Sequence, residues 1–346
     1  MDVPTAGDAP RRVSGSDAEL LVVVHGGVDM HLDAASSRTM VAAADAGCSA
    51  PGDLLDAAAV AVSHLEADPA FNAGVGSVLN ASGLAEVDAA IIDGSTGRFG
   101  AVGAAPDITA PATVALEVLR RRNGVLISGV GARDLAEQIG VDCRDLRTDE
   151  QITLFEEFLS GATSQSRFTG RGLRSASESM TGAISGSGRD SAPVMPTETV
   201  GSIVVCAGRV VAASSTGGVV GKVPGRIGDA AVLGAGIWAD DRVGVLCSGM
   251  GEAMIELQLA LRVAQRVHDG DALDDAVAWA VSHARHERNA ICAVVAVDAH
   301  TEAVSAAHSG SAFPVRARSS QGAYWVDSTD VTAGEVGVRQ IGGVVP

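Results

Sequence analysis

The chain has few aromatic residues for its length. Phenylalanine, tryptophan and tyrosine make up 3% of the 346 residues, whereas apolar residues of all kinds make up 47%. A core of this composition must be built from alanine, valine, leucine and isoleucine, with close backbone approaches at many of the 42 glycines. A chain of this length can bury a large core, either in one big domain or in two.

The cysteines lack the spacing of a disulfide framework or a zinc site. There are five, they are widely scattered, and no two form a CxxC pair. Cys206, Cys247 and Cys292 lie in apolar, strand-like runs, so we expect them to be small core residues.

Positive charge is scarce, which limits the partners. The formal net charge is −17, so no basic face is available for the phosphates of a nucleic acid or for an anionic membrane surface. No apolar run reaches the length of a membrane span, and we expect no secretion signal in the polar N-terminal residues. We expect a cytoplasmic protein with no nucleic-acid or membrane partner.

The chain alternates short apolar runs with helical patterns. Runs of β-branched residues predict strands, and apolar residues at helical spacing predict helices. The strands are predicted at 20–24, 85–92, 99–104, 125–129, 202–206, 210–213, 243–247, 290–297 and 303–307, and the helices at 54–66, 110–121, 132–139, 150–159, 253–267 and up to about 283. Asp53 is the expected N-cap of the first helix, and Asp271 or Asp274 that of the last. We expect helices over antiparallel sheets, without parallel crossovers.

Two segments lack this pattern. Residues 1–19 are predicted to be a disordered leader, and residues from about 160 to 198 form a linker rich in serine, glycine, threonine and alanine. The linker ends abruptly at Glu198-Thr199, where a strand-like run begins. This boundary suggests a cut site between Glu198 and Thr199. Cleavage there would create a chain that begins with threonine, which carries its own hydroxyl nucleophile and its own α-amine base.

Arg226 and Asp229 stand three residues apart in a glycine-rich segment, where a short turn could present both on one side. A guanidinium suits a carboxylate and a carboxylate suits an ammonium group, so the two could bind the charged groups of a free amino acid. The alternative is a local salt bridge between them.

Three other sites in the sequence each have two interpretations. Asn72 either organises a site or serves as a turn residue. Ser248 and Gly249 lie between a strand and a helix, where they could hold an oxyanion, or the serine could cap the helix. The glycines at 26–27 either form a plain turn or let the backbone approach a ligand or a moving loop. The common hydrolase motifs GxSxG and HExxH are absent.

Seven motifs give the chain a resemblance to a known family. They are HGG at 25–27, LEADPAFNAGVGSV at 65–78, DAAIIDGSTGRFGAVGA at 88–104, TVGSIVV at 199–205, SSTGG at 214–218, KVPGRIGD at 222–229 and GAGIWADD at 234–241. From about residue 20 to 312, the chain resembles the plant-type asparaginase and isoaspartyl peptidase family of N-terminal-nucleophile hydrolases, in the threonine aspartase superfamily.

This resemblance implies the architecture of the protein. The implied fold is α+β, a four-layer αββα sandwich, in a single domain over residues 20–346. The precursor is expected to cleave itself into an α chain of residues 20–198 and a β chain of residues 199–346. Two such αβ units would associate as a heterotetramer.

The same resemblance implies the catalytic residues. Thr199 matches the nucleophile, and Thr216 matches the second threonine that supports it. Asn72 matches an asparagine that helps to position or stabilise the reacting groups. Ser248 and Gly249 align with the pair that holds the oxyanion.

The family pattern also implies the ligands. Arg226 and Asp229 match the binders of the substrate carboxylate and amine. No cofactor is implied for catalysis, but a structural sodium ion is implied in a loop whose backbone carbonyls would be its ligands. The candidate ligands are Leu65, Glu66, Asp68, Phe71, Ala73 and Val75.

The implied reaction is hydrolysis of the side-chain amide of L-asparagine, or of the β-linkage of an isoaspartyl dipeptide, with release of aspartate. The alternatives are a glycosylasparaginase-like or other N-terminal-threonine amidase, and an unprocessed homologue that only binds an amino acid.

Three positions depart from the family pattern. Ser248 replaces the usual threonine, Met250 replaces a small residue, and Glu198 stands where glycine or aspartate usually precedes the nucleophile. Asp229 argues against the taspase branch.

Overall fold

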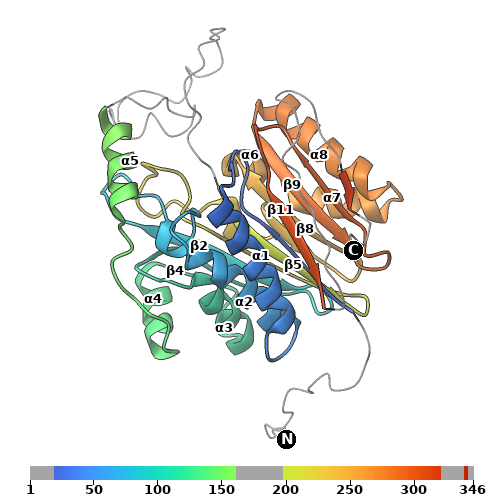
Figure 1. Ribbon diagram of the computed structural model, residues 1–346, viewed down its shortest axis with the longest axis horizontal. Helices are drawn as coiled ribbons and strands as arrows, with labels where there is room; N and C mark the ends of the chain where they lie inside the picture. Colours follow the sequence, from blue (N-terminus) through green and yellow to red (C-terminus); the bar gives the residue numbers. More distant parts are fainter. Residues whose placement is uncertain (1–18, 161–197, 321–338, 342–346) are drawn as a thin grey trace, which may run out of the picture.

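The computed structural model describes residues 19–160 and 198–320, together with the backbone of residues 339–341. The predicted leader, up to residue 18, and the linker at 161–197 lie outside the described residues. Within them, two β-sheets face each other, and each is covered on its outer side by helices (Figure 1). This arrangement is the predicted α+β fold, a four-layer αββα sandwich.

The larger sheet carries the residues on both sides of the predicted cut. Its strand order is β11-β1-β5-β6-β2-β3-β4. In the central hairpin of β5 and β6, Val200 is paired with Ser215, so Thr199 and Thr216 lie at the same end of the two strands. The strands in chain order are β1 (Leu20–His25), β2 (Glu86–Asp93), β3 (Arg98–Pro106), β4 (Leu126–Ser128), β5 (Val200–Cys206), β6 (Arg209–Thr216) and β11 (Val315–Ser319).

The smaller sheet packs against the larger one through small and branched side chains. Its order is β12-β10-β9-β8-β7. Gly244 lets the sheets approach, because a Cβ there would lie 2.7 Å from side-chain atoms of Ile203 and Val210 in the larger sheet. The core between the sheets therefore needs little aromatic volume. The strands are β7 (Ile237–Ala239), β8 (Val243–Gly249), β9 (Cys292–Asp298), β10 (Val304–His308) and β12 (Arg339–Ile341).

Helices form the two outer layers. Those over the larger sheet are α1 (Ala34–Ser49), α2 (Leu54–Glu66), α3 (Pro111–Arg121) and α4 (Gly129–Gln138), and α5 (Asp149–Ser160) follows them in the chain. Those on the smaller sheet are α6 (Gly251–Leu257), α7 (Leu259–His268) and α8 (Leu273–Arg288). Asp53 caps α2 as predicted, since its carboxylate accepts the N–H groups of Leu55 and Asp56.

Four expectations were wrong in detail. The helix predicted at 253–267 is two helices, broken at Gln258, because the N–H groups of Ala260 and Leu261 bond to the carbonyls of residues 235 and 234. The cap position of α8 is Ala272, so neither aspartate caps it. Strands β3 and β4 are parallel, with α3 as the crossover between them. Of the three cysteines expected in the core, Cys206 is only partly buried.

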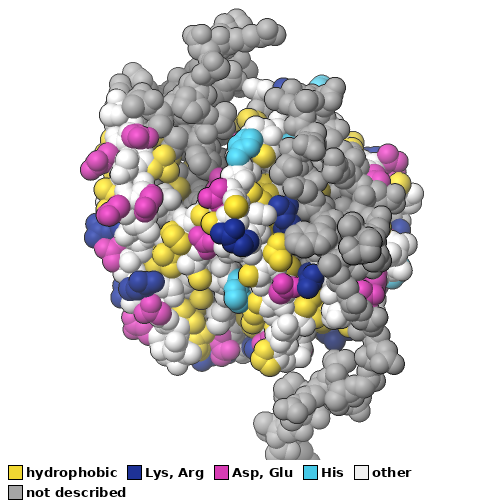
Figure 2. Space-filling model, in the orientation of Figure 1, with side chains coloured by type: hydrophobic (Ala, Val, Ile, Leu, Met, Phe, Trp, Pro, Cys, Tyr) yellow, Lys and Arg dark blue, Asp and Glu magenta, His cyan; other side chains and the backbone are white. Residues whose placement is uncertain are grey.

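The surface agrees with the acidic composition. On the face shown in Figure 2, acidic and basic side chains are interspersed over the coloured residues, without a continuous basic patch. None of the helices in the described ranges is long and apolar enough to cross a membrane.

Candidate active site

The Glu198–Thr199 peptide is held from both sides by hydroxyl groups. Thr216 Oγ1 donates a hydrogen bond of 3.0 Å to the carbonyl oxygen of Glu198. The N–H of Thr199 donates to Ser248 Oγ at 3.3 Å. Thr199, Thr216 and Ser248 are all buried. Thr199 directly precedes β5, Thr216 is the last residue of β6, and Ser248 is the last but one of β8. The fold thus brings together three predicted site residues that are distant in sequence.

Thr216 is placed to act on a carbonyl. Its Oγ1 accepts the N–H of Gly218 at 3.0 Å while it donates to the Glu198 oxygen, so the direction of its hydrogen is fixed. A fixed O–H donor at a carbonyl oxygen stabilises the negative charge that develops there when the carbon is attacked.

Ser248 does not cap a helix. It lies within β8, and the cap position of α6 is Met250, so the capping interpretation is wrong. Its Oγ accepts the N–H groups of Val28, at 3.0 Å, and of Thr199. Gly249 has a φ of 130°, and a Cβ there would lie 2.7 Å from Cα of Cys292, so no side chain fits. The Met250 side chain packs against the core beneath α6–α8.

Asn72 joins the loop after α2 to the turn after Thr216. Its Nδ2 donates to the carbonyl of Gly218 at 2.8 Å, and its Oδ1 accepts the N–H of Val78 at 3.0 Å. Its own carbonyl accepts the N–H of Gly217 at 2.8 Å. The side chain therefore joins these two loops, and it fixes the segment that follows the second threonine.

Arg226 and Asp229 do not pair with each other, so the salt-bridge alternative is wrong. Arg226 binds Glu252 instead, with its Nε at 3.0 Å and its Nη2 at 2.9 Å from the same carboxylate oxygen. Asp229 is buried, and its Oδ2 has no hydrogen-bond partner in the described part of the chain. A Cβ on Gly251 would lie 2.6 Å from Asp229 Oδ1 and 2.9 Å from Arg226 Nη2, so both groups approach the same space.

Two acidic residues of β2 hold the loop that carries Arg226 and Asp229. Asp88 accepts the N–H groups of Gly228, at 2.8 Å, and of Ala104, at 2.7 Å. The side chain of Glu86 accepts the N–H of Gly225 at 3.0 Å, and its backbone carbonyl accepts the ammonium of buried Lys222 at 2.7 Å. Asp88 is also the strand partner of Thr216, so one position of β2 serves both parts of the site.

The residue before the predicted cut packs against the HGG motif. Gly27 has a φ of 106°, and a Cβ there would lie 2.8 Å from Cα of Glu198. The glycine thus permits a close approach of two backbone segments. Burial, and then the negative charge of Asp29, raise the pKa of Glu198 to about 8. Burial lowers the pKa of His25 to about 3, so its ring is neutral beside Thr199.

Comparisons with known proteins agree with this geometry. A family model described as asparaginase matches residues 19–324. A plant-type L-asparaginase of Thermococcus kodakarensis is 36% identical over 219 residues, which cover 63% of this chain and 68% of that protein. An isoaspartyl peptidase/L-asparaginase of Rattus norvegicus is 31% identical over 291 residues, 82% of this chain and 81% of that protein. The chain belongs to the asparaginase family. The members of this family are N-terminal-nucleophile hydrolases that act on amide bonds.

In this asparaginase-family chain, the predicted sodium ligands run from the last two residues of α2, Leu65 and Glu66, into the tight loop that follows the helix. The carbonyls of Leu65, Asp68, Phe71 and Ala73 each accept a backbone N–H within the loop. A Cβ on Gly74 would lie 2.5 Å from the carbonyl oxygen of Glu66, so oxygens crowd the space that the glycine leaves open. Each carbonyl keeps a second lone pair, and hard cations prefer oxygen ligands. The loop therefore suits such an ion.

Another possible metal cluster is weaker. Asp240, Asp241 and His268 could share an ion, but Asp240 already accepts the indole N–H of Trp238 at 2.9 Å and the N–H of Arg242 at 2.9 Å. Asp241 is exposed, and we assign no function to this cluster.

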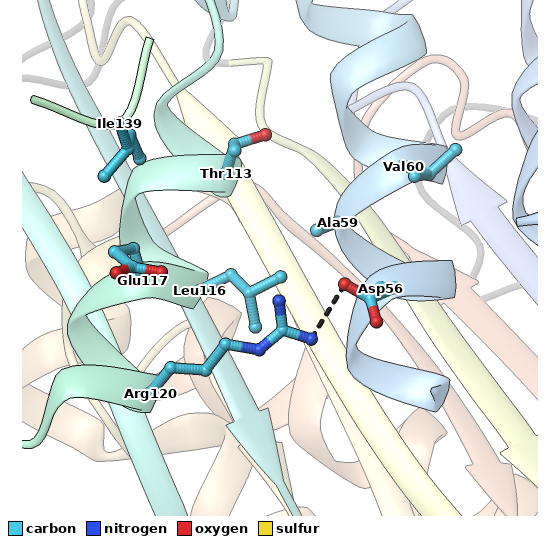
Figure 3. Close-up of a pocket in the computed structure, with 8 residues that line it drawn as sticks. All are labelled: Asp56, Ala59, Val60, Thr113, Leu116, Glu117, Arg120 and Ile139. Carbon is cyan, nitrogen blue, oxygen red and sulfur yellow. Dashed lines mark hydrogen bonds and ion pairs between the residues drawn. The ribbon is translucent and has the colours of Figure 1, made fainter. Parts of the chain in front are cut away.

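A surface groove lies apart from this site. It has a volume of about 270 Å³ between α2 and α3, and none of the predicted site residues lines it (Figure 3). Arg120 extends across it and pairs with Asp56, with 2.8 Å between Nη2 and Oδ1 (Figure 3). The other charged residue of the lining, Glu117, pairs with Arg121 at 2.6 Å, so the charged groups in the groove already have ionic partners.

Sequence reasoning missed Glu252, Asp88 and Glu86. Glu252 is 26 residues from Arg226 and Asp88 is 140 from Gly228, so local spacing gave no signal. Asp88 could have been noticed as a charged residue at the start of an otherwise apolar run, because a buried carboxylate needs partners.

Proposed function

We propose that this protein is a self-processing amidohydrolase with Thr199 as its N-terminal nucleophile. Its substrates are L-asparagine, at the side-chain amide, and isoaspartyl dipeptides, at the β-linkage, and its product is aspartate. One observation carries the proposal: the Glu198–Thr199 peptide lies between Thr216 Oγ1, at 3.0 Å from the carbonyl oxygen, and Ser248 Oγ, at 3.3 Å from the nitrogen. The names of the relatives support the substrate class.

Self-cleavage begins with attack of Thr199 Oγ on the carbonyl carbon of Glu198. The hydroxyl of Thr216 stabilises the charge on the carbonyl oxygen. The hydroxyl proton passes to the departing nitrogen as the C–N bond breaks, which leaves an ester on Thr199 and a free α-amine beside Ser248. Water then hydrolyses the ester, frees the hydroxyl of Thr199 and leaves Glu198 as a C-terminal carboxylate.

Turnover uses the new α-amine. Its reference pKa is about 7.7–8.0, so it can accept the proton of Thr199 Oγ near neutral pH. The oxygen attacks the substrate amide carbon, and we expect Ser248 and Gly249 to face the resulting oxyanion. The protonated amine gives its proton to the leaving ammonia or amino acid. Water hydrolyses the aspartyl ester and restores Thr199.

Substrate recognition follows from the two charged residues near Gly251. We assign the substrate α-carboxylate to Arg226 and the α-ammonium group to Asp229, because both side chains approach the space that Gly251 leaves open. The substrate is thus a free amino acid or a short peptide with a free aspartyl end.

Further parts of the proposal concern ions and assembly. The backbone carbonyls of the loop after α2 would hold a structural sodium ion, and no cofactor is needed for catalysis. Two αβ units would form a heterotetramer. We place the enzyme in the cytoplasm, without a nucleic-acid or membrane partner.

Replacement of the nucleophile tests the proposal. Wild-type protein should give two fragments on a denaturing gel, the smaller one starting at Thr199. Thr199→Ala should remain a single chain and should not release ammonia from asparagine. Thr301→Ala, in an exposed turn, is the control and should behave as wild type. Two fragments from Thr199→Ala, or full activity from an uncut wild-type chain, would refute the assignment.

A further inference from the structure

Glu252 contacts the arginine that we assign to the substrate carboxylate. It lies in the first turn of α6, and its Oε1 accepts hydrogen bonds from both Nε and Nη2 of Arg226. The Arg226 side chain is 17% exposed and that of Glu252 is 35% exposed. Salt screens a pair at this depth less than a pair on the open surface. The contact therefore fixes the plane and direction of the guanidinium.

This contact leaves one edge of the guanidinium for a ligand. Arginine presents five N–H donors in a planar fork, and Glu252 uses the edge formed by Nε and Nη2. Nη1 donates to no other residue in the described part of the chain, and it lies 2.7 Å from the Cβ position of Gly228 and 3.3 Å from that of Gly218. The glycines thus let the guanidinium lie close to their backbone. The Nη1–Nη2 edge keeps N–H groups that no acceptor in the described residues binds, so it can bind a carboxylate through two hydrogen bonds.

Asp229 is close enough to compete for this edge. Its Oδ1 and Arg226 Nη2 approach the same point above Gly251, at 2.6 and 2.9 Å from the Cβ position. Without another partner, the guanidinium would turn to Asp229, and the two charges would neutralise each other. Glu252 binds the adjacent Nε–Nη2 edge of Arg226 and so holds the guanidinium in place.

We propose that Glu252 is a positioning residue that keeps Arg226 apart from Asp229. The two residues then remain available for the carboxylate and the ammonium group of one amino-acid substrate. This inference rests on the proposed function, in which Arg226 and Asp229 bind those two groups. It explains how opposite charges three residues apart in the chain avoid forming a local salt bridge.

Steady-state kinetics of Glu252→Gln test the role. Loss of a charge-assisted hydrogen bond to Arg226 should raise KM for L-asparagine about tenfold or more. Since Glu252 does not touch Thr199 or Thr216, kcat should stay within about threefold of wild type. Glu252→Asp, which keeps the charge but has a shorter reach, should have an intermediate KM. Both variants should cleave themselves as wild type does, which confirms that they fold.

Glu256→Gln is the matched control. Glu256 lies on the same helix and pairs with Arg288 at 2.6 Å on the surface, so its loss should change neither KM nor kcat. A double-mutant cycle with Arg226→Ala then shows whether Glu252 acts through the arginine. If it does, Glu252→Gln adds nothing to the KM of Arg226→Ala.

The possible outcomes separate this inference from the proposed function. An unchanged KM in Glu252→Gln, or effects that add fully in the cycle, would overturn the role of Glu252 and leave the proposed function intact. An unchanged KM in Arg226→Ala would instead remove Arg226 from substrate binding, and both assignments would fail. A raised KM with non-additive effects supports the inference.

Discussion

Asp229 shows how burial at a single residue makes substrate binding depend on pH. Its surroundings raise its pKa to about 7, with burial as the largest cause and with Arg226 acting in the opposite direction. The carboxylates of Glu252 and Asp88 raise it further. The buried thiols that also face it are neutral at this pH, because burial raises their own pKa values; they are Cys247 and Cys292.

Substrate affinity should therefore fall in mild acid. Asp229 must be ionised to bind an ammonium group, and protonation removes that charge as the pH falls through about 7. We expect KM for asparagine to be constant above about pH 8 and to rise about tenfold per pH unit well below 7, because one proton competes with the substrate. Asp229→Asn should have a high KM that does not vary with pH over this range. A flat wild-type KM between these pH values would contradict the assignment.

At the scale of elements, the spacing of apolar residues predicted the helices and strands whose conformation depends on their own residues. Helix α2 carries its cap and its apolar face in one continuous stretch, so the sequence predicted both. The break at Gln258 depends on carbonyls of the segment 234–235, about two dozen residues earlier, and no local pattern contains that information. The residues of the site also divide into those that the sequence could identify and those that it could not. Thr199, Thr216 and Arg226 belong to recognisable motifs, whereas Glu252 enters it only through tertiary packing.

The link between β2 and the loop of Arg226 can be broken at Asp88. Its carboxylate accepts two backbone N–H groups, from Ala104 and Gly228, whereas an asparagine would turn an N–H₂ donor toward one of them. Asp88→Asn should lower the free energy of unfolding by about 1–3 kcal/mol, the cost of one buried unsatisfied group. It should also raise KM, since the loop loses an anchor. Denaturant unfolding and steady-state kinetics measure both effects.

The control for this change is Asp93→Asn at the other end of β2. Asp93 accepts hydrogen bonds from residues 95 and 96 in its own turn, away from the site. It should lose some stability without a change in KM. If Asp88→Asn also leaves KM unchanged, Asp88 stabilises the fold but does not position the substrate loop.

At the scale of the whole molecule, the motifs in the sequence were enough to predict four layers, and the composition was enough to predict a core of small side chains. The strand order was not predictable, because it depends on pairings between distant segments. That order places the hairpin of β5 and β6 between β1 and β2 in the larger sheet. Strands from both sides of the predicted cut therefore alternate, and the main-chain hydrogen bonds of β1 with β5 and of β2 with β6 join the two proposed chains.

This strand order predicts that cleavage does not separate the fragments. The β5–β6 hairpin is bonded on both sides to strands of the other fragment, so its release would break two ladders in the middle of the sheet and expose the cores on both faces. Cleaved protein should elute as one species in gel filtration and unfold in a single transition, with a denaturant slope like that of uncut Thr199→Ala, because both expose the same surface. The fragments should separate only in denaturant. Their separation under native conditions would show that the paired strands do not hold the two chains together.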